Sequence, residues 1–322
     1  MRKKIYPTKL VRLRFTRALV CCALFVPALC AGDAFAQSRK PAASPATAAA
    51  AATTTPALKR KATRREVRRF GYGNTLTLYG APDGSITIEA WPRAEIEIVA
   101  DIELQAGTED DLARLAAVNG FVLDEDATHF RLVTTGTHDR KFMKNAAKNN
   151  PAAKNFPKHL LAMPWRIDYR IRVPALVDLE VFAGRGALVL DGVQGALQLS
   201  AGESRSVLTL VGGDVSATVV GGSVLLRVPV QSWRGRGATV KMAAGELTVA
   251  LPAGFNGEVS ATILRTGRIE GADAAFGAGE RAVSNERSLR LRAGGGGAPF
   301  TFEVVDGVIR FERLGGAPPP QP

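Results

Sequence analysis

The feature that most constrains this chain is a five-residue unit in which a glycine precedes two apolar residues separated by one other residue. The unit occurs eight times, beginning at Gly84, Gly186, Gly195, Gly213, Gly222, Gly245, Gly257 and Gly307. Apolar residues that alternate in this way all point to one side of a β-strand. A glycine supplies the positive φ that a tight reversal of the chain needs. The unit therefore predicts short strands with one buried face, each preceded by a turn.

The spacing of these units indicates how the strands are arranged. Between Gly186 and Gly257 the units begin at intervals of 9, 18, 9, 23 and 12 residues, which is typical of a sandwich, a barrel or a β-solenoid. The inward positions of residues 184–232 hold Val, Leu and Ala with almost no aromatic residues. Side chains of these sizes suit a narrow stacked core, whereas sandwich cores usually use larger anchors. We therefore predict an all-β domain over residues 70–313, with repetitive short strands in a solenoid-like or two-layer β-repeat.

The first 36 residues have the order of a secretory signal peptide. Seven basic residues precede an apolar run over residues 18–29, and Ala34-Phe35-Ala36 provides the small residues of a cleavage site. The apolar run is shorter than the roughly 20 residues that a membrane-spanning helix needs. We expect export to the periplasm or the cell surface, with no transmembrane span in the mature chain. All three cysteines lie in this segment, so the mature chain would be cysteine-free.

The formal charge of +12 is concentrated before residue 70. Residues 1–36 carry a net charge of +6 and residues 37–69 a net charge of +8, which leaves −2 for the remainder. We expect residues 37–69 to be a disordered Ala/Thr/Pro and basic linker, and residues 314–322 a disordered Pro-rich tail. The basic run at the end of the linker is either a solvated charge run or a segment attracted to an anionic surface. A nearly neutral domain on an exported chain argues against nucleic acid as a partner.

One short helix and one inserted loop interrupt the strand pattern. Thr108 precedes three carboxylates and an apolar stripe that ends at Gly120, which predicts a capped helix. Residues 136–165 have no strand period, carry a net charge of +5 and contain three prolines. We expect this segment to be a basic loop inserted into the domain.

The chain resembles the bacterial putative-adhesin family, also called the toast-rack β-strand-repeat family, a domain of unknown function. The matching features are an Asp83–Ile88 unit followed by Trp91, an alternating run at 95–100, the Ile171–Pro174 segment before the glycine-spaced strands, glycines 294–297, and the closing run at 300–309. The resemblance covers about residues 70–313. It implies an exported adhesin-like β-repeat, and it provides no catalytic residues. The loop at 136–165 departs from the family's pattern.

This basic loop is the best candidate for a binding site. Its cations alternate with aromatic residues, a composition that suits an acidic polymer because charges attract it while rings stack on sugar faces. The candidate residues are Arg140, Lys141, Phe142, Lys144, Lys148, Lys154, Phe156, Lys158 and Trp165. In the alternative interpretation, the loop is a surface segment whose aromatic residues fold back onto the domain.

No catalytic or metal site is predicted. The three histidines lack metal-binding spacing, and the chain has no Gly-x-Ser-x-Gly sequence. The paired glycines lack the helix and lysine of a phosphate-binding loop. Carboxylates at 124–126 lack the spaced ligands of a calcium loop. Three others, Asp214, Glu246 and Glu258, share one position of the repeat. They would form either an acidic ladder, if the units stack, or a solvated acidic rim, which is the interpretation we favour.

These observations favour a non-enzymatic exported envelope protein with no cofactor. In this hypothesis an adhesin-like β-repeat scaffold presents a binding surface to an anionic glycan, a lipopolysaccharide or another lipid, or an envelope protein. Two alternatives stay open. One is a polysaccharide-active enzyme on a β-solenoid, with carboxylates from neighbouring strands. The other is a regulatory periplasmic domain that senses the state of the envelope.

Overall fold

The computed structural model describes residues 58–71, 73–149, 151, 153–276 and 283–315, and these residues all fall within one compact unit of the chain. The predicted signal peptide at 1–36, the linker up to residue 57 and the tail from residue 316 lie outside the described residues.

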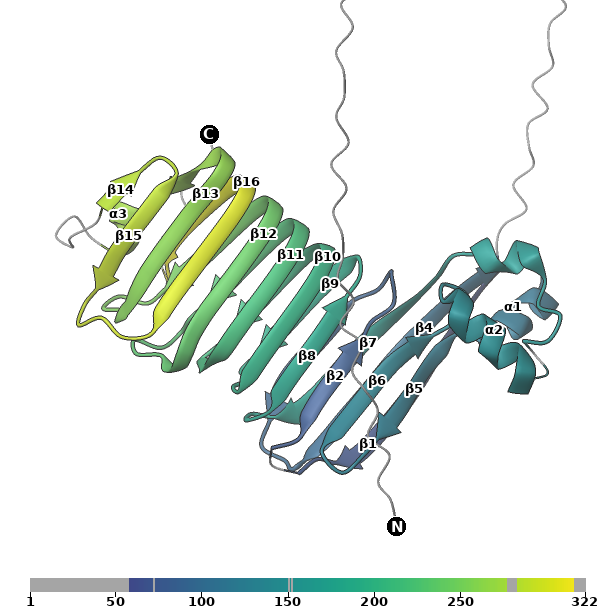
Figure 1. Cartoon of the computed structure of the whole chain (residues 1–322). Helices are drawn as coiled ribbons and strands as arrows, with labels where there is room; N and C mark the ends of the chain where they lie inside the picture. The colour runs from purple at the N-terminus through teal and green to yellow at the C-terminus, as the bar shows by residue number, and fades with distance from the viewer. Residues whose placement is uncertain (1–57, 72, 150, 152, 277–282, 316–322) are drawn as a thin grey trace, which may run out of the picture. The chain divides into compact units, whose positions relative to one another are not determined.

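Strands make up most of the described chain, as Figure 1 shows. They are β1 (Leu58–Arg69), β2 (Thr75–Tyr79), β3 (Ile86–Trp91), β4 (Glu95–Ala106), β5 (Gly120–Glu125), β6 (His129–Thr135), β7 (Trp165–Pro174), β8 (Asp178–Ala183), β9 (Gly186–Asp191), β10 (Ala196–Thr209), β11 (Gly212–Arg227), β12 (Arg234–Leu251), β13 (Gly257–Glu270), β14 (Val283–Asn285), β15 (Ser288–Ala293) and β16 (Pro299–Arg313). The helices are α1 (Glu109–Ala116), α2 (Arg140–Asn149), the 3₁₀ helix η1 (Lys158–Ala162) and α3 (Ala272–Phe276). This confirms the predicted all-β class.

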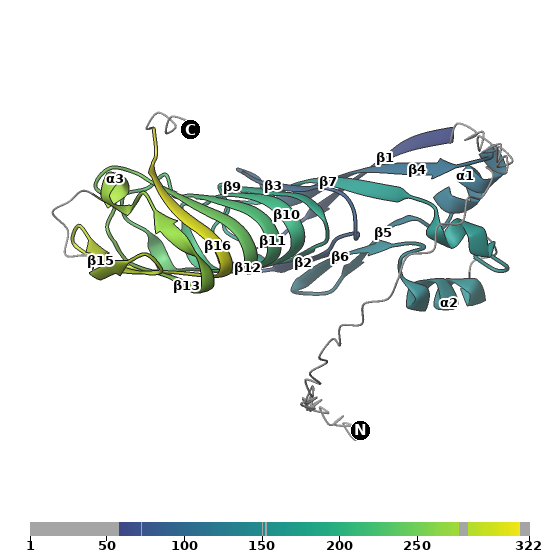
Figure 2. The same cartoon turned by 90° about the horizontal axis from the view of Figure 1, so that it is seen from above.

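The strands before β10 form two layers. One layer has the order β5-β6-β2-β8 and the other has the order β1-β4-β7-β3-β9. Figure 2 shows β1, β4 and β7 in one layer and β2, β5 and β6 in the other. Both layers join at β10, because its first half pairs with β8 and its second half pairs with β9. The two-layer arrangement therefore leads directly into the repeat that follows.

From β10 onward the strands are long, parallel and stacked in register. Ala196 of β10 lies beside Asp214 of β11, an offset of 18 residues along the chain. The order continues through β12, β16 and β13, all pairing in parallel. Only the last strands, β15 and β14, add to the sheet antiparallel. This is the solenoid-like part of the predicted fold.

Each long strand bends in its middle, at a glycine. In β11, odd-numbered residues from Val215 to Val219 are buried, but after the bend the even-numbered Val224 and Leu226 are buried. Gly222 lies at the change, with a φ of 103°. A β-carbon there would overlap the carbonyl oxygen of Ser204 on β10. The prediction of a positive φ is right for this glycine, but the expected tight reversal is wrong because the glycine turns one continuous strand from one face to the other.

One main hydrophobic cluster runs between the two faces. In the middle rungs it is built from residues of moderate size, such as Leu199, Ala217 and Val240. Toward the C-terminal end it includes Phe300, Phe302 and Phe311, whose rings contact one another. Buried aliphatic and aromatic area of this extent is the main source of stability for a fold of this kind.

The linker prediction is wrong over residues 58–69, because these residues form the edge strand β1, antiparallel to β4. The reason is charge complementarity. Lys59 and Lys61 lie 3.7 and 3.5 Å from the carboxylate of Glu103, and Arg65 bonds to Glu97. Basic residues that looked like a solvated run are therefore partly neutralised by the acidic residues of β4.

Of the two non-strand segments, only the first matches its prediction. Thr108 caps α1 by accepting a 3.2 Å hydrogen bond from the N–H of Asp111, and Leu112 and Leu115 are buried. The segment at 136–165, predicted as a loop, instead contains α2 and η1. Few apolar residues mark the helical period of α2, and the three prolines of the segment all lie after this helix rather than inside it.

Candidate binding site on the basic segment

Asp139 starts helix α2. Its Oδ1 accepts hydrogen bonds from the backbone N–H groups of Lys141 at 2.8 Å and Phe142 at 3.0 Å. An aspartate in this position satisfies N–H groups that the helix itself leaves unpaired, and its charge opposes the positive end of the helix dipole. The single acid of the segment is therefore engaged at the helix start.

The inner side of α2 packs on a small cluster of its own. Met143 is buried together with Val118 and Ala153. Phe142, Ala146 and Phe156 pack around them, partly buried. Phe156 also contacts a neighbouring cluster that contains Leu112 and Leu115 of α1. The segment is thus held against the domain through its apolar side chains.

The outer side of α2 carries lysines on one face. Lys141, Lys144 and Lys148 are spaced by three and four residues, so they lie along one side of the helix, and all three are exposed. Arg140, Lys154 and Lys158 are exposed as well. We call these six residues the basic segment. Within the part of the chain that the structure describes, none of them forms an ion pair closer than 4 Å.

The aromatic residues of the predicted site do not stand among the lysines. Phe142 and Phe156 contribute to the packing beneath α2, as the alternative interpretation of the loop describes. Trp165 begins β7 and packs partly buried at the edge of the core. The structure therefore separates the predicted residues into an exposed cationic face, two packing phenylalanines and one tryptophan beside a depression.

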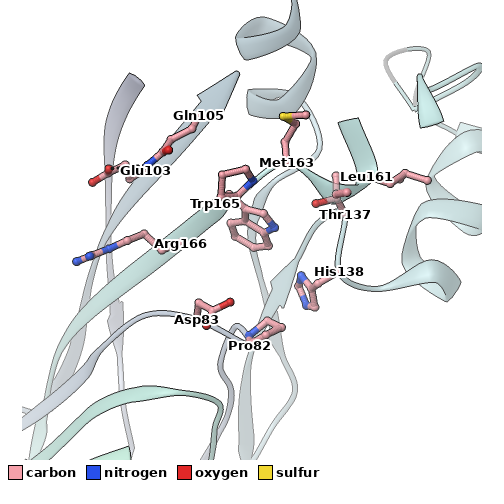
Figure 3. A pocket seen from close by; sticks show the side chains of 12 residues that line it. Pro82, Asp83, Glu103, Gln105, Thr137, His138, Leu161, Met163, Trp165 and Arg166 are labelled. Atoms are coloured by element: carbon pink, nitrogen blue, oxygen red, sulfur yellow. Dashed lines mark hydrogen bonds between the residues drawn. The ribbon is translucent and has the colours of Figure 1, made fainter. Parts of the chain in front are cut away.

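Trp165 stands at the centre of this depression, shown in Figure 3. The cavity has a volume of about 400 Å³. Its lining includes Pro82, Asp83, Glu103, His138, Trp165 and Arg166. We call it the Trp165 pocket. An aromatic ring with planar polar side chains around it is suited to a sugar ring, because the ring face packs on C–H groups while the polar groups bond to hydroxyls.

The charged groups around the Trp165 pocket are held in place by partners. Asp83 bonds to the guanidinium of Arg185 at 3.0 and 3.1 Å. Arg166 Nε donates to Asp168 at 3.0 Å. Partial burial acts against the charged form of Asp168, but hydrogen bonds from Arg166 and Ser85 outweigh it and keep the pKa of Asp168 below its ordinary value. These pairings fix the directions of the polar side chains.

His138 forms one wall of the pocket. Although part of its side chain is exposed, its ring lies 5.2 Å from that of Trp165, centroid to centroid. Burial lowers the pKa of His138, while the neighbouring Asp139 acts in the opposite direction with less effect. The imidazole is therefore neutral at pH 7 and provides one donor and one acceptor.

A buried amide lies close to Trp165. A β-carbon on Gly136 would meet both the Asn119 side chain and the indole of Trp165. Asn119 Oδ1 accepts a 2.9 Å hydrogen bond from the N–H of Thr137, but its Nδ2 has no partner among the described residues. Sequence reasoning missed Asn119, Asp83, Glu103 and His138 as neighbours of Trp165, because only the pairing of β4 with β7 and the position of residues 136–138 bring them together.

The other acidic groups considered from the sequence are not assembled into a site. Asp214 lies level with Gly237, whereas Glu246 lies level with Ser223 and Val308, so the two belong to different faces of the repeat. The acidic ladder considered from the sequence is therefore not formed. Among the described residues, no group of three or more His, Cys, Asp or Glu is placed to hold a metal ion.

No helix in the described ranges is long and apolar enough to cross a membrane.

Comparisons with known proteins extend only to solved structures. No family model matches the chain, and no curated protein matches its sequence. Similar structures include a putative cell adhesion protein from Clostridium sporogenes ATCC 15579, with 13% identity over 78% of this chain and 100% of that chain and a TM-score of 0.39. A putative adhesin from Bacteroides fragilis NCTC 9343 has 10% identity over 79% and 97%, with a TM-score of 0.33. A putative lipid binding protein from Parabacteroides distasonis ATCC 8503 has 9% identity over 78% and 96%, with a TM-score of 0.27.

The class of protein that the fold defines is a parallel β-strand-repeat protein with a two-layer N-terminal part. Each of the three structures has a TM-score below 0.5.

Proposed function

We propose that this protein is an exported, adhesin-like and non-enzymatic binder of an anionic glycan in the periplasm or at the cell surface. The glycan would contact the basic segment, with one sugar ring against Trp165. Export is supported by the order of residues in the first 36 positions, and the Trp165 pocket supports a sugar rather than a bare anion.

One observation carries the proposal. Most cations of β1 have an acidic partner, as Lys59 and Lys61 do with Glu103 of β4, whereas the six cations of the basic segment have none among the described residues. Charges without an internal partner attract an external anion, and each lysine near an anionic surface contributes about 1 kcal/mol. The face of α2 is therefore free to bind without first breaking an ion pair.

The experiment measures binding of the full chain to immobilised polygalacturonate and to purified lipopolysaccharide, with neutral dextran as a reference. We expect binding to the two anionic glycans that weakens as salt rises. The variant Lys141→Ala/Lys144→Ala/Lys148→Ala should lose most of it. A control with equal charge loss is Arg205→Ala/Arg227→Ala/Arg234→Ala, on exposed residues of the repeat. Equal loss in both variants would show that net charge alone is responsible.

A second variant tests the sugar ring. Trp165→Leu keeps apolar volume at the edge of the core but removes the aromatic face. We expect affinity for the glycan to fall several-fold with little change in salt dependence, because stacking is an uncharged interaction. Unchanged affinity would remove the Trp165 pocket from the proposal and leave the lysines.

A further inference from the structure

A second concave site lies at the other end of the repeat. A cavity of about 440 Å³ opens on the outer surface of β13, β15 and β16. Its polar lining consists of Glu258, Ser260, Arg290, Arg292 and Thr301. The sequence pattern singled out Glu258 but not the two arginines, since Arg290 and Arg292 come from an antiparallel strand that follows a non-repetitive segment.

The two arginines of this cavity are available to a ligand. Arg290 and Arg292 are both exposed and lie two residues apart, so they point to the same side of β15. Within the described part of the chain, neither forms an ion pair closer than 4 Å. Arg292 donates one hydrogen bond to the carbonyl of Gly295 at 2.8 Å, which steadies its guanidinium. The cavity also holds the carboxylate of Glu258, so two cationic groups stand beside one acceptor.

A line of short polar side chains leads away from the cavity across the sheet. Strand register places Ser260 beside Arg290, then Thr301, Thr239, Ser216 and Gln198 on successive neighbouring strands. We call Ser260, Thr301, Thr239, Ser216 and Gln198 the polar row. Because the strands pair in register, these side chains emerge on one face at the strand spacing of about 4.8 Å. None of the five makes a side-chain hydrogen bond to another described residue.

A second line runs parallel to the polar row, two residues further along each strand. It consists of Ser200, Thr218, Lys241, Glu303 and Thr262, in matching register. Lys241 and Glu303 form an ion pair of 2.9 Å. The face beside the arginine cavity is therefore polar over a width of two side chains. Exposed Val220 and Leu264 lie two residues beyond the second line, at the border of this polar strip.

We propose that this face binds an extended anionic polysaccharide that runs across the strands. Arg290 and Arg292 bind a carboxylate or sulfate of one sugar, and Glu258 accepts a hydrogen bond from a hydroxyl of the same sugar. The polar row bonds to hydroxyls of the sugars that follow. Guanidinium groups suit planar or multidentate anions, and side chains repeated at a fixed spacing suit a repeating ligand better than an irregular protein surface.

The geometry fixes the length of ligand that the face can hold. From Arg290 to Gln198 the line crosses six adjacent strands, a distance of about 24 Å at the usual strand spacing. Affinity for oligosaccharides should therefore rise with length until this distance is spanned, and then level off. A ligand held only by the two arginines would show no such dependence.

The test uses the full chain carrying Lys141→Ala/Lys144→Ala/Lys148→Ala, so that the basic segment does not contribute. Probes are galacturonate oligosaccharides of increasing length, dextran sulfate and neutral dextran, with binding measured by calorimetry. We expect Arg290→Gln/Arg292→Gln to weaken binding by about tenfold or more, because two charge-assisted contacts are removed. Arg205→Gln/Arg227→Gln, on exposed arginines elsewhere in the repeat, should not.

The polar row has its own matched pair of variants. Thr239→Val/Thr301→Val keeps branched side chains in β12 and β16 but removes two hydroxyls. The affinity of the protein for long oligosaccharides should therefore fall several-fold. Thr248→Val, on the opposite face of β12, should leave binding unchanged. Preference for galacturonate or for dextran sulfate identifies the anion, and either supports the site.

Equal binding of neutral dextran, or full affinity after the Arg290 and Arg292 substitutions, would overturn the inference. Absence of any effect of the α2 lysines, in contrast, would contradict only the proposed function. Unchanged unfolding midpoints show that each variant is folded.

Discussion

The carbonyl oxygen of Gly222 on β11 occupies the place that a β-carbon on Gly245 of β12 would need. Gly245 has a φ of 123°, at the bend of its strand. The same contact recurs along the repeat: Gly307 on β16 lies against the carbonyl of Gly245 in the same way. The bends of neighbouring strands can therefore stack closely only because the glycines there lack side chains. These stacked glycines form a column, and the register between the strands depends on it.

We expect Gly245→Ala to lower the free energy of unfolding by about 2 kcal/mol or more, since it adds both backbone strain and a clash with fixed backbone. Gly221→Ala is the matched control. Gly221 has no positive φ, and a β-carbon there would meet its nearest atoms at 3.6 and 3.9 Å, which is ordinary contact. Urea unfolding of both variants checks this. Equal destabilisation would mean that the column is not special.

Glu97 links the edge strand to the sheet, and its contribution depends on pH. Its carboxylate accepts hydrogen bonds from Arg65 at 2.7 Å and Arg172 at 3.1 Å. The hydrogen bond from Arg65 holds the pKa of Glu97 below its ordinary value of 4.5, because its effect is larger than the opposing effect of burial. A carboxyl with a lowered pKa stabilises the fold above its ordinary pKa and loses this contribution as the pH falls.

Glu97→Gln should therefore lower the free energy of unfolding by about 1–3 kcal/mol at pH 7, and the difference from the unchanged protein should shrink as the pH falls below 4.5. Urea titrations between pH 7 and pH 3 measure it. Glu95→Gln, at the start of the same strand and without an ion pair to a described residue, is the control. A gap that stays constant over this range would contradict the assignment.

His138 should titrate below its ordinary pKa of 6.5, because burial against Trp165 disfavours the charged ring. The unfolded chain then takes up this proton first as the pH falls, so His138 lowers the stability of the fold below about pH 6.5 and has no such effect above it. Imidazole resonances followed by NMR, assigned with His138→Gln, measure the midpoint. A midpoint above 6.5 would show that Asp139 outweighs burial.

Helix α2 should unfold separately from the rest of the domain. Met143 is its main buried residue, in a cluster distinct from the large core. Met143→Ala should weaken the packing of α2 on the domain by about 2 kcal/mol. Hydrogen exchange of residues 140–148 should then become more than tenfold faster, while the main unfolding transition changes little. Lys144→Ala, on the exposed face of the same helix, is the control.

Much of the repeat could be predicted from sequence because one periodic feature carries it. The apolar alternation after Gly222 and Gly245 gives both the strands and their inward residues, and positive φ follows from the glycine itself. What the pattern could not show is that these glycines bend strands that continue. The same local sequence is compatible with a next strand that returns antiparallel and with one that stacks in parallel one rung further on. Only the partner strands, which are distant in sequence, determine which of the two arrangements forms.

The site was less predictable for a similar reason. The cations of β1 and those of α2 look alike in sequence. They differ in the structure because acidic residues pair with most of the β1 cations, as those of β4 do with Lys61 and Arg65. The role of Phe142 beneath α2 depends on Val118 and Ala153, which no spacing rule brings together. Charge type can be predicted locally, whereas the presence of a counter-charge is a property of the fold.

The constant offset of 18 residues between β10 and β11 makes the length of this protein adjustable in whole steps. Duplicating one such stretch would insert a rung whose ends match the rungs on both sides, because each rung presents the same pattern above and below. Every insertion would move the two ends of the domain apart by about 4.8 Å. Gene duplication could therefore change the distance between the two ends in fixed steps while the core packing within each rung stays the same.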